Sequence, residues 1–146
     1  MEGFTGSYGG YHGSGFQHLT SVQRLQEGMA IGEWTHERDA TAKLRIYQPK
    51  AASETFLANA QVSPVKHTKL LKYMIAREKG DDLESTFVSV IEPFKDSAWI
   101  RDVKVVESGS DKGEIIEVQW KDAQGQLVKD VVTINTTTSA FELQRT

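Results

Sequence analysis

The sequence has 146 residues, of which 38% are hydrophobic and 25% are charged, and its formal net charge is −3. This is the composition of an ordinary folded domain, which excludes a disordered chain, and the small negative charge excludes a global attraction to nucleic acid or to acidic polymers. The absence of cysteine excludes disulfides and thiolate ligands, and no apolar run approaches the roughly 20 residues that a membrane-spanning helix needs.

The first 15 residues, MEGFTGSYGGYHGSG, contain six of the 12 glycines. A segment this rich in glycine loses much conformational entropy when it becomes ordered, and it has few side chains to bury. We therefore expect residues 1–15 to form a flexible or interdomain segment and residues 16–146 to form a single domain. The start of the chain lacks the hydrophobic stretch of an export signal, which favours a piece of a larger protein.

From residue 16 onward, short segments rich in apolar residues are separated by turn residues. They predict about ten strands, over residues 16–25, 31–37, 43–48, 54–60, 70–78, 85–92, 99–107, 114–120, 127–135 and 140–144. Residues 66–79 also contain good helix formers, but the alternation of Leu71, Tyr73 and Ile75 favours a strand there. No helical period is held for three turns, so the predicted fold is an all-β antiparallel sandwich of about ten short strands.

The strand over residues 85–92 has the clearest pattern, because β-branched and aromatic residues occupy both of its faces, as in a strand buried from two sides. Pro93 is expected to end this strand, since proline cannot donate to the ladder. Two turns are predicted further on, at SGSDKG (108–113) and at DAQG (122–125).

The four histidines are scattered over separate segments, and no two have a spacing that would preset a metal site. They are His12, His18, His36 and His67. We therefore expect no metal site. Tyr11 and His12 are neighbours in the glycine-rich segment and are candidates for the base and acid of a proton abstraction. The favoured alternative is two incidental polar rings in a loop.

The larger aromatic residues are spaced about one to a strand, which is typical of the core of a sandwich. They are Trp34, Tyr47, Tyr73, Trp99 and Trp120. We expect most of them to lie in the core. Trp120 is the exception, because it stands at a strand end beside a polar turn, and it is a candidate for stacking against a sugar ring.

Residues 66–79 hold the only local excess of positive charge. On a strand, Lys69, Arg77 and Lys79 would share one face and Lys72 would lie opposite, so the cluster does not form a single stripe. A solvated face is the ordinary interpretation of such a run. Lys69 and Arg77 are the candidates for contacts with a carboxylate or sulfate of an acidic polysaccharide.

Several pieces of the sequence occur in a characteristic order. They are FQHLTSVQR (16–24), Trp34, LRIY (44–47), FLAN (56–59), LKYMIAREKG (71–80) and STFVSVIEPFKDSAWIRDVKVVE (85–107). In order and rough spacing they resemble, over residues 13–107, the C-terminal β-sandwich region of heparinase II/III-like polysaccharide lyases. The last forty residues match that region only in their hairpin character.

This resemblance implies a parent enzyme that joins an N-terminal (α/α) toroid to a β-sandwich and cleaves uronic-acid-containing polysaccharides by β-elimination. A Tyr or His base and neutralisation of the carboxylate drive that reaction. It also implies a periplasmic or extracellular location. In several members a zinc ion has a structural role in the sandwich region.

The catalytic and metal-binding motifs of that family lie in the toroid and in earlier sandwich strands, and none of them occurs here. No catalytic, metal or cofactor residue is therefore carried over. The matching positions are expected to be scaffold: Tyr73, Arg77, Phe87, Val88, Val90, Glu92, Pro93 and Ile100. Glu92 and Pro93 are expected to shape the exit of their strand.

Three functions remain open from the sequence. The favoured one is an accessory domain that is inactive alone and whose partners are the toroid, the earlier sandwich strands and an acidic polysaccharide, with neither nucleic acid nor membrane among them. The second is a stand-alone carbohydrate-binding module. The third is a self-sufficient lyase that uses Tyr11 and His12.

Overall fold

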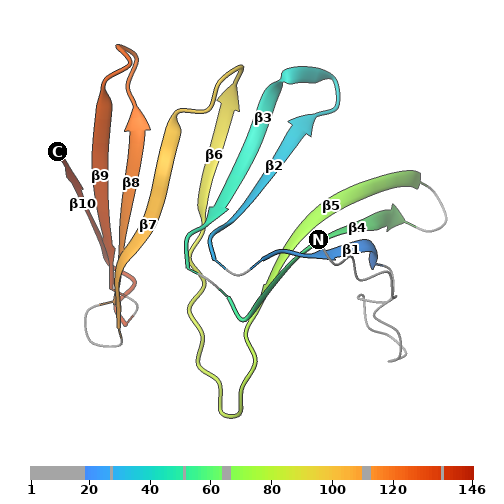
Figure 1. The fold of residues 1–146 in the computed structure, drawn as a ribbon, viewed down its shortest axis with the longest axis horizontal. Helices are drawn as coiled ribbons and strands as arrows, with labels where there is room; N and C mark the ends of the chain where they lie inside the picture. Colours follow the sequence, from blue (N-terminus) through green and yellow to red (C-terminus); the bar gives the residue numbers. More distant parts are fainter. Residues whose placement is uncertain (1–18, 27, 51, 64–66, 110–112, 136) are drawn as a thin grey trace. The chain divides into compact units, whose positions relative to one another are not determined.

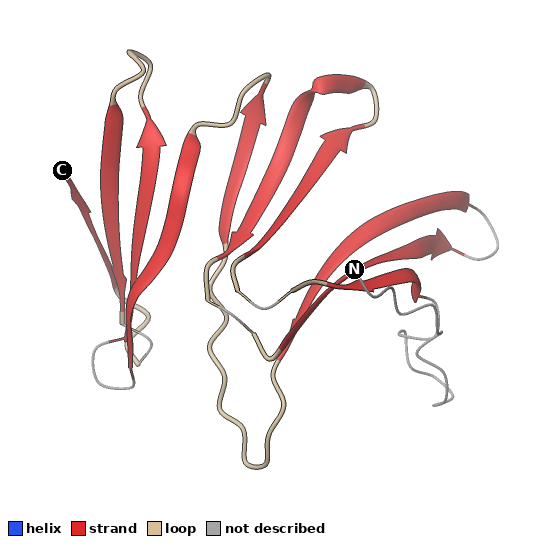
Figure 2. Ribbon diagram, in the orientation of Figure 1, coloured by secondary structure: helices blue, strands red, loops and turns tan. Residues whose placement is uncertain are grey.

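A computed structural model describes residues 19–26, 28–50, 52–63, 67–109, 113–135 and 137–146 (Figure 1). These residues form ten strands and no helix, and the strands pair in three antiparallel sheets (Figure 2). The predicted all-β antiparallel class of about ten strands is confirmed, and the three sheets are consistent with a sandwich.

The chain divides into two compact units. One comprises residues 1–30 and 51–87, and the other comprises residues 31–50 and 88–146. The expectation of a single domain over residues 16–146 stays a prediction. Residues 1–15, the predicted interdomain segment, lie outside the described residues.

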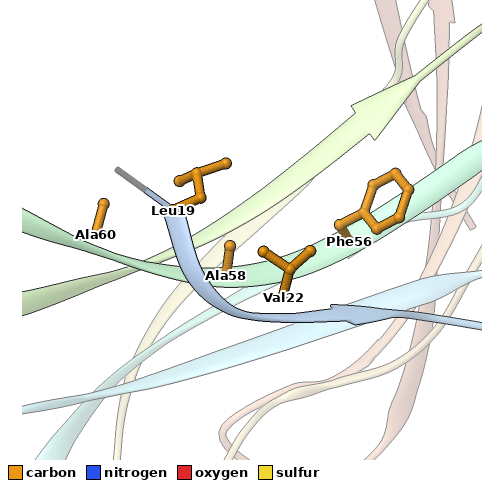
Figure 3. Close-up of a cluster of buried hydrophobic side chains, with 5 residues drawn as sticks. All are labelled: Leu19, Val22, Phe56, Ala58 and Ala60. Atoms are coloured by element: carbon orange, nitrogen blue, oxygen red, sulfur yellow. The ribbon is translucent and has the colours of Figure 1, made fainter. Parts of the chain in front are cut away.

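The first unit contains a three-stranded sheet in the order β1-β4-β5, with β1 at Leu19–Arg24, β4 at Glu54–Ser63 and β5 at His67–Arg77. Side chains alternate between the faces of a strand, so the apolar residues at every second position of β4 lie together. They pack with residues of β1 in a buried cluster of Leu19, Val22, Phe56, Ala58 and Ala60 (Figure 3). Ile75 of β5 packs against this cluster. The segment that also contains good helix formers is thus a strand, as the alternation predicts.

The second unit contains two sheets. The first has the order β2-β3-β6, with β2 at Ala30–His36, β3 at Asp39–Gln48 and β6 at Val90–Lys95. The second has the order β10-β9-β8-β7, with β7 at Ile100–Gly109, β8 at Gly113–Lys121, β9 at Leu127–Ile134 and β10 at Phe141–Arg145.

One buried cluster joins the two sheets of the second unit. Tyr47 comes from β3, Val103 from β7 and Ile116 from β8, and Val88 lies just before β6. The four side chains come from elements far apart in the sequence, so their burial stabilises the packing of one sheet against the other. This burial provides the hydrophobic stabilisation of the unit.

The predicted strand over residues 85–92 is wrong in its bounds and its burial. Residues 85–89 lie outside the strands, β6 begins at Val90, and it continues through Pro93 to Lys95. Phe87 and Ile91 are half exposed, with 50% and 59% of their surface accessible, so the segment is not buried from two sides. Since β6 is an edge strand of its sheet, the missing N–H of Pro93 leaves no ladder partner unsatisfied, and proline does not end the strand.

The hairpin turn predicted at residues 122–125 is confirmed. The carbonyl of Asp122 accepts a hydrogen bond from the Gly125 amide, and its carboxylate accepts from the amides of Gln124 and Gln126. Gly125 has a φ of 80°, which glycine adopts without steric cost. The other predicted turn includes residues 110–112, which are outside the described part of the chain.

Candidate functional site

The residues singled out in the sequence do not form one site within either unit. Arg77 and Lys69 belong to β5 in the first unit, whereas Trp120 belongs to β8 in the second. Tyr11 and His12 lie outside the described residues, so their catalytic role stays a prediction. Arg77 and Trp120 therefore belong to different polar groups, one in each unit.

Arg77 is part of a group of three cations that meet at one carboxylate, which we call the Glu54 cluster: Arg24, Glu54, Arg77 and Lys79. Oε2 of Glu54 lies 2.9 Å from Arg77 Nε and 2.9 Å from Lys79 Nζ. Its other oxygen, Oε1, lies 3.7 Å from Arg24 Nη2. Three positive charges and one negative charge give the cluster a net charge of +2.

Strand pairing explains why these residues meet. Glu54 begins β4 and is the register partner of Arg77, the last residue of β5, while Arg24 ends β1 on the other side of β4. The guanidinium carbon of Arg77 also lies 5.7 Å from the ring centre of Phe56, a cation–π contact that orients the side chain. The cluster therefore lies where the paired strands of one sheet begin and end, with Lys79 just beyond the end of β5.

The Glu54 cluster is organised around its carboxylate but open to solvent at its cations. The Glu54 side chain is only 10% exposed, whereas those of Arg24 and Lys79 are 52% and 58% exposed. Hydrogen bonds from Arg77 and then Lys79 lower the pKa of Glu54, so this carboxylate stays ionised. An arrangement of exposed cations held by a central anion is suited to contact a carboxylate or sulfate of a ligand.

Trp120 lies in a second polar group, with Asp130 of β9 and Arg145 of β10. The indole Nε1 donates to Asp130 Oδ2 at 3.0 Å, and Arg145 binds the same carboxylate through Nε at 2.7 Å and Nη2 at 3.0 Å. The guanidinium carbon of Arg145 lies 5.1 Å from the centre of the Trp120 ring. One face of the indole is thus covered from within the chain, and a sugar-binding role for Trp120 stays a prediction.

The charge state of this group is set by its own ion pair. The hydrogen bond from Arg145 lowers the pKa of Asp130, and the hydrogen bond from Trp120 lowers it further, against the opposing effect of burial. Asp130 therefore stays ionised at neutral pH, and the group is a structural ion pair and not a proton donor.

The expectation that most of the larger aromatic residues lie in the core holds for Tyr47, which is 3% exposed. It is wrong for Tyr73 and Trp99, which are 41% and 62% exposed. Tyr73 lies on β5, an edge strand of a three-stranded sheet, and Trp99 comes just before the edge strand β7. Edge positions have a neighbouring strand on one side only, which a spacing of one aromatic to a strand does not reveal.

Glu92 is a buried carboxylate of the second unit that accepts several hydrogen bonds. It is 6% exposed and accepts hydrogen bonds from the Tyr47 hydroxyl at 2.9 Å and from the amides of Trp99 and Ile100 at 2.5 Å and 2.8 Å. Arg45 Nη1 in turn lies 3.1 Å from the Tyr47 hydroxyl. The carboxylate thereby holds the first residue of β7 against β3 and β6.

Tyr47 is not a candidate for the base of a β-elimination. Burial raises its pKa, and its hydroxyl is engaged by Glu92 and Arg45. A tyrosine base has to reach the substrate and to lose its proton readily, and Tyr47 meets neither condition. The Tyr47–Glu92 network is therefore structural.

Several residues of these clusters were missed in the sequence: Arg24, Glu54, Asp130 and Arg145. Arg24 and Glu54 are 30 positions apart in the numbering, and their meeting depends on the pairing of β1 with β4. No local sequence pattern predicts which strands pair with each other. The basic run over residues 66–79 was the one available signal, and it marked the whole of β5 without distinguishing its two ends.

Among the described residues, no group of three or more His, Cys, Asp and Glu side chains is placed to hold a metal ion. That part of the chain also has no helix of the length and apolar character needed to cross a membrane. No family model matches the chain, and no curated protein or solved structure is significantly similar to it. The resemblance to heparinase II/III-like lyases therefore stays a prediction.

Proposed function

We propose that this chain is the C-terminal accessory β-sandwich of a heparinase II/III-like polysaccharide lyase and that it has a structural role without catalytic activity of its own. The observation that carries the proposal is the Tyr47–Glu92 network. Two separate pieces of the resemblance supply these residues: Tyr47 comes from LRIY, and both Glu92 and Ile100 come from the piece over residues 85–107. They meet in one buried hydrogen-bonded group. Residues that match a family and build its scaffold are expected to converge in this way.

The described residues favour a scaffold over a catalyst. β-Elimination needs a base beside the proton to be abstracted and a group that neutralises the uronate. The Tyr47 hydroxyl is buried and hydrogen-bonded, and the lowered pKa values of Asp130 and Glu54 make both carboxylates weak proton acceptors. Catalysis would then fall to the toroid and the earlier sandwich strands of the parent enzyme.

The Glu54 cluster favours a second candidate, a carbohydrate-binding module that recognises an acidic polysaccharide. Its net charge of +2 stands out in a chain whose formal net charge is −3, so the attraction is local. The two candidates are compatible, since an accessory domain can also hold the substrate chain.

The test of the first candidate has two parts. The reading frame that encodes this segment should also encode an (α/α) toroid upstream, and its absence would contradict the accessory role. The purified chain, incubated with heparin, heparan sulfate and alginate, should release no unsaturated uronate, measured by ultraviolet absorbance against an active lyase as positive control. Product formation that Tyr11→Phe abolishes would instead establish the self-sufficient lyase.

A further inference from the structure

The strand β10 is an edge of its four-stranded sheet, and half of its backbone groups face outward. Thr146, just after the strand, exchanges two hydrogen bonds with Lys129 of β9, at 2.9 Å and 3.1 Å. Hydrogen-bonding direction alternates along a strand. Glu142 and Gln144 therefore bond toward β9, whereas Phe141, Leu143 and Arg145 direct their N–H and C=O groups away from it, and no described strand pairs with that side.

Three of the other five edge strands carry features that discourage pairing with another strand. β1 has an irregularity between Thr20 and Gln23, β6 contains Pro93, and β7 has two shifts of register against β8. β10 has none of these, since its five residues pair with β9 in unbroken register and include no proline. Its outer side is therefore a regular pairing edge.

Two of the five exposed side chains of β10 are large and apolar. Phe141 and Leu143 are 77% and 53% exposed, and the register places them on the same sheet face as Ile134 and Val132. Large apolar side chains beside unpaired backbone groups are features of a strand that accepts a partner strand.

We infer that β10 pairs antiparallel with β10 of a second copy of this chain, about a two-fold axis at Leu143. The pairing would join the two four-stranded sheets into one of eight strands. It would place Leu143 opposite Leu143 of the partner subunit, and Phe141 opposite Arg145 of the partner subunit. Glu142 would lie opposite Gln144 of the partner subunit.

This register favours a second copy because β10 is complementary to itself. All the outward backbone groups of residues 141, 143 and 145 find partners, which is not so when the axis is moved to either end of the strand. No like charges lie opposite each other, whereas an axis at Arg145 would put two guanidinium groups together. The small net charge of −3 on each chain adds little repulsion.

The test measures the oligomeric state of the full chain by analytical ultracentrifugation over a wide range of concentrations. The chain should be a dimer, and Leu143→Lys should raise the dimer dissociation constant by about tenfold or more, because it puts two ammonium groups at the axis. Leu127→Lys is the matched control. Leu127 is also exposed, at 62%, and lies on β9 away from the proposed axis, so this variant should leave the dimer unchanged.

A cysteine scan tests the register and does not depend on the lysine variant. Since the sequence has no cysteine, each single variant carries one thiol. A hydrogen-bonded antiparallel pair has a Cα separation of about 5.5 Å, which suits a disulfide, so Leu143→Cys should form a covalent dimer under mild oxidation. Leu127→Cys and Phe141→Cys should not. A monomeric chain, a dimer indifferent to Leu143→Lys, or equal cross-linking at all three positions would overturn the inference.

Discussion

The hydroxyl of Tyr47 lies 2.9 Å from Oε2 of Glu92, although 45 positions separate the two residues in the sequence. The other oxygen of the same carboxylate binds the amides of Trp99 and Ile100. A buried carboxylate is stable only when its hydrogen-bonding capacity is used, and here two strands and a loop supply the donors. This relationship makes the second unit sensitive to single changes at either residue.

Tyr47→Phe should lower the free energy of unfolding by about 2 kcal/mol, because it removes a donor from a buried carboxylate and leaves the ring in place. Urea denaturation followed by circular dichroism measures the change. Tyr73→Phe is the matched control: the same atom is removed from a side chain that is 41% exposed, and the effect should stay within about 0.5 kcal/mol. Equal effects of the two variants would mean that the network does not stabilise the fold.

The stability contributed by Asp130 should depend on pH. The pKa of this carboxyl is lowered in the folded chain, below its ordinary value of 3.8, chiefly by Arg145. A lowered folded-state pKa contributes stability that is fully present above about pH 3.8 and is lost as the pH falls through the folded value. The difference in unfolding free energy between the native chain and Asp130→Asn should therefore be largest near neutral pH and should shrink in acid.

Arg145→Gln provides the control for this pH dependence. It removes the main cause of the lowered pKa of Asp130. The unfolding free energy of this variant should therefore change less as the pH falls below about 3.8 than that of the native chain. Urea denaturation at a series of pH values, with tryptophan fluorescence as a second probe, measures both variants. Parallel stability curves for the native chain and Asp130→Asn would contradict the assignment.

Gly113→Ala should destabilise the hairpin of β7 and β8 severely. Gly113 has a φ of 77°, and a Cβ atom at this position would lie 1.9 Å from the carbonyl oxygen of Ile134, which is backbone and cannot move without disturbing β9. The loss of stability should be several kcal/mol, since strain and overpacking act together.

Gly125→Ala is the matched comparison for Gly113→Ala. Its φ is 80°, but nothing lies within 4 Å of the added Cβ atom, so only the backbone strain of roughly 1–2 kcal/mol is expected. Thermal denaturation of both variants separates the cost of backbone strain from the cost of overpacking against Ile134. A smaller loss of stability for Gly113→Ala than for Gly125→Ala would contradict the close approach of Gly113 to the backbone of Ile134.

Heparin should bind the chain through the Glu54 cluster. Arg24→Gln and Lys79→Gln should each weaken the affinity by roughly threefold to tenfold, measured by isothermal titration calorimetry at low ionic strength, and added salt should weaken all binding. Lys121→Gln removes the same charge from an exposed position at the end of β8 and should have little effect. Equal losses for all three variants would indicate non-specific attraction, and saturable binding of a neutral polysaccharide would exclude the charge-based site.

The elements read best from the sequence are those governed by local chemistry. The hairpin at residues 122–125 was correct because Asp122 and Gly125 satisfy the turn through their own backbone and side chain. The strand predicted over residues 70–78, which the structure has as β5 at His67–Arg77, was correct in type because alternation distinguishes a strand from a helix within a few residues. The strand over 85–92 was wrong because its apolar composition gave no sign that Pro93 would occupy an edge.

The candidate site was only partly predictable, because its residues come from strands far apart in the sequence. Arg77 and Lys79 belong to the basic run over residues 66–79, but the carboxylate that gathers them, Glu54, lies on another strand. Trp120 was recognised as an unusual aromatic residue, whereas its partners Asp130 and Arg145 were not. Each missing partner comes from another strand of the same sheet, and the order of the strands decides which side chains come close.

The sequence by itself determined that this protein is built from about ten short antiparallel strands, since turn residues and a two-residue period act within a few positions of the chain. The tertiary structure alone decided which strands are neighbours, which edges are left open and which charges meet. Those outcomes depend on contacts between residues far apart in the sequence. The hydrogen bond between Tyr47 and Glu92 and the cations around Glu54 both arise at that level.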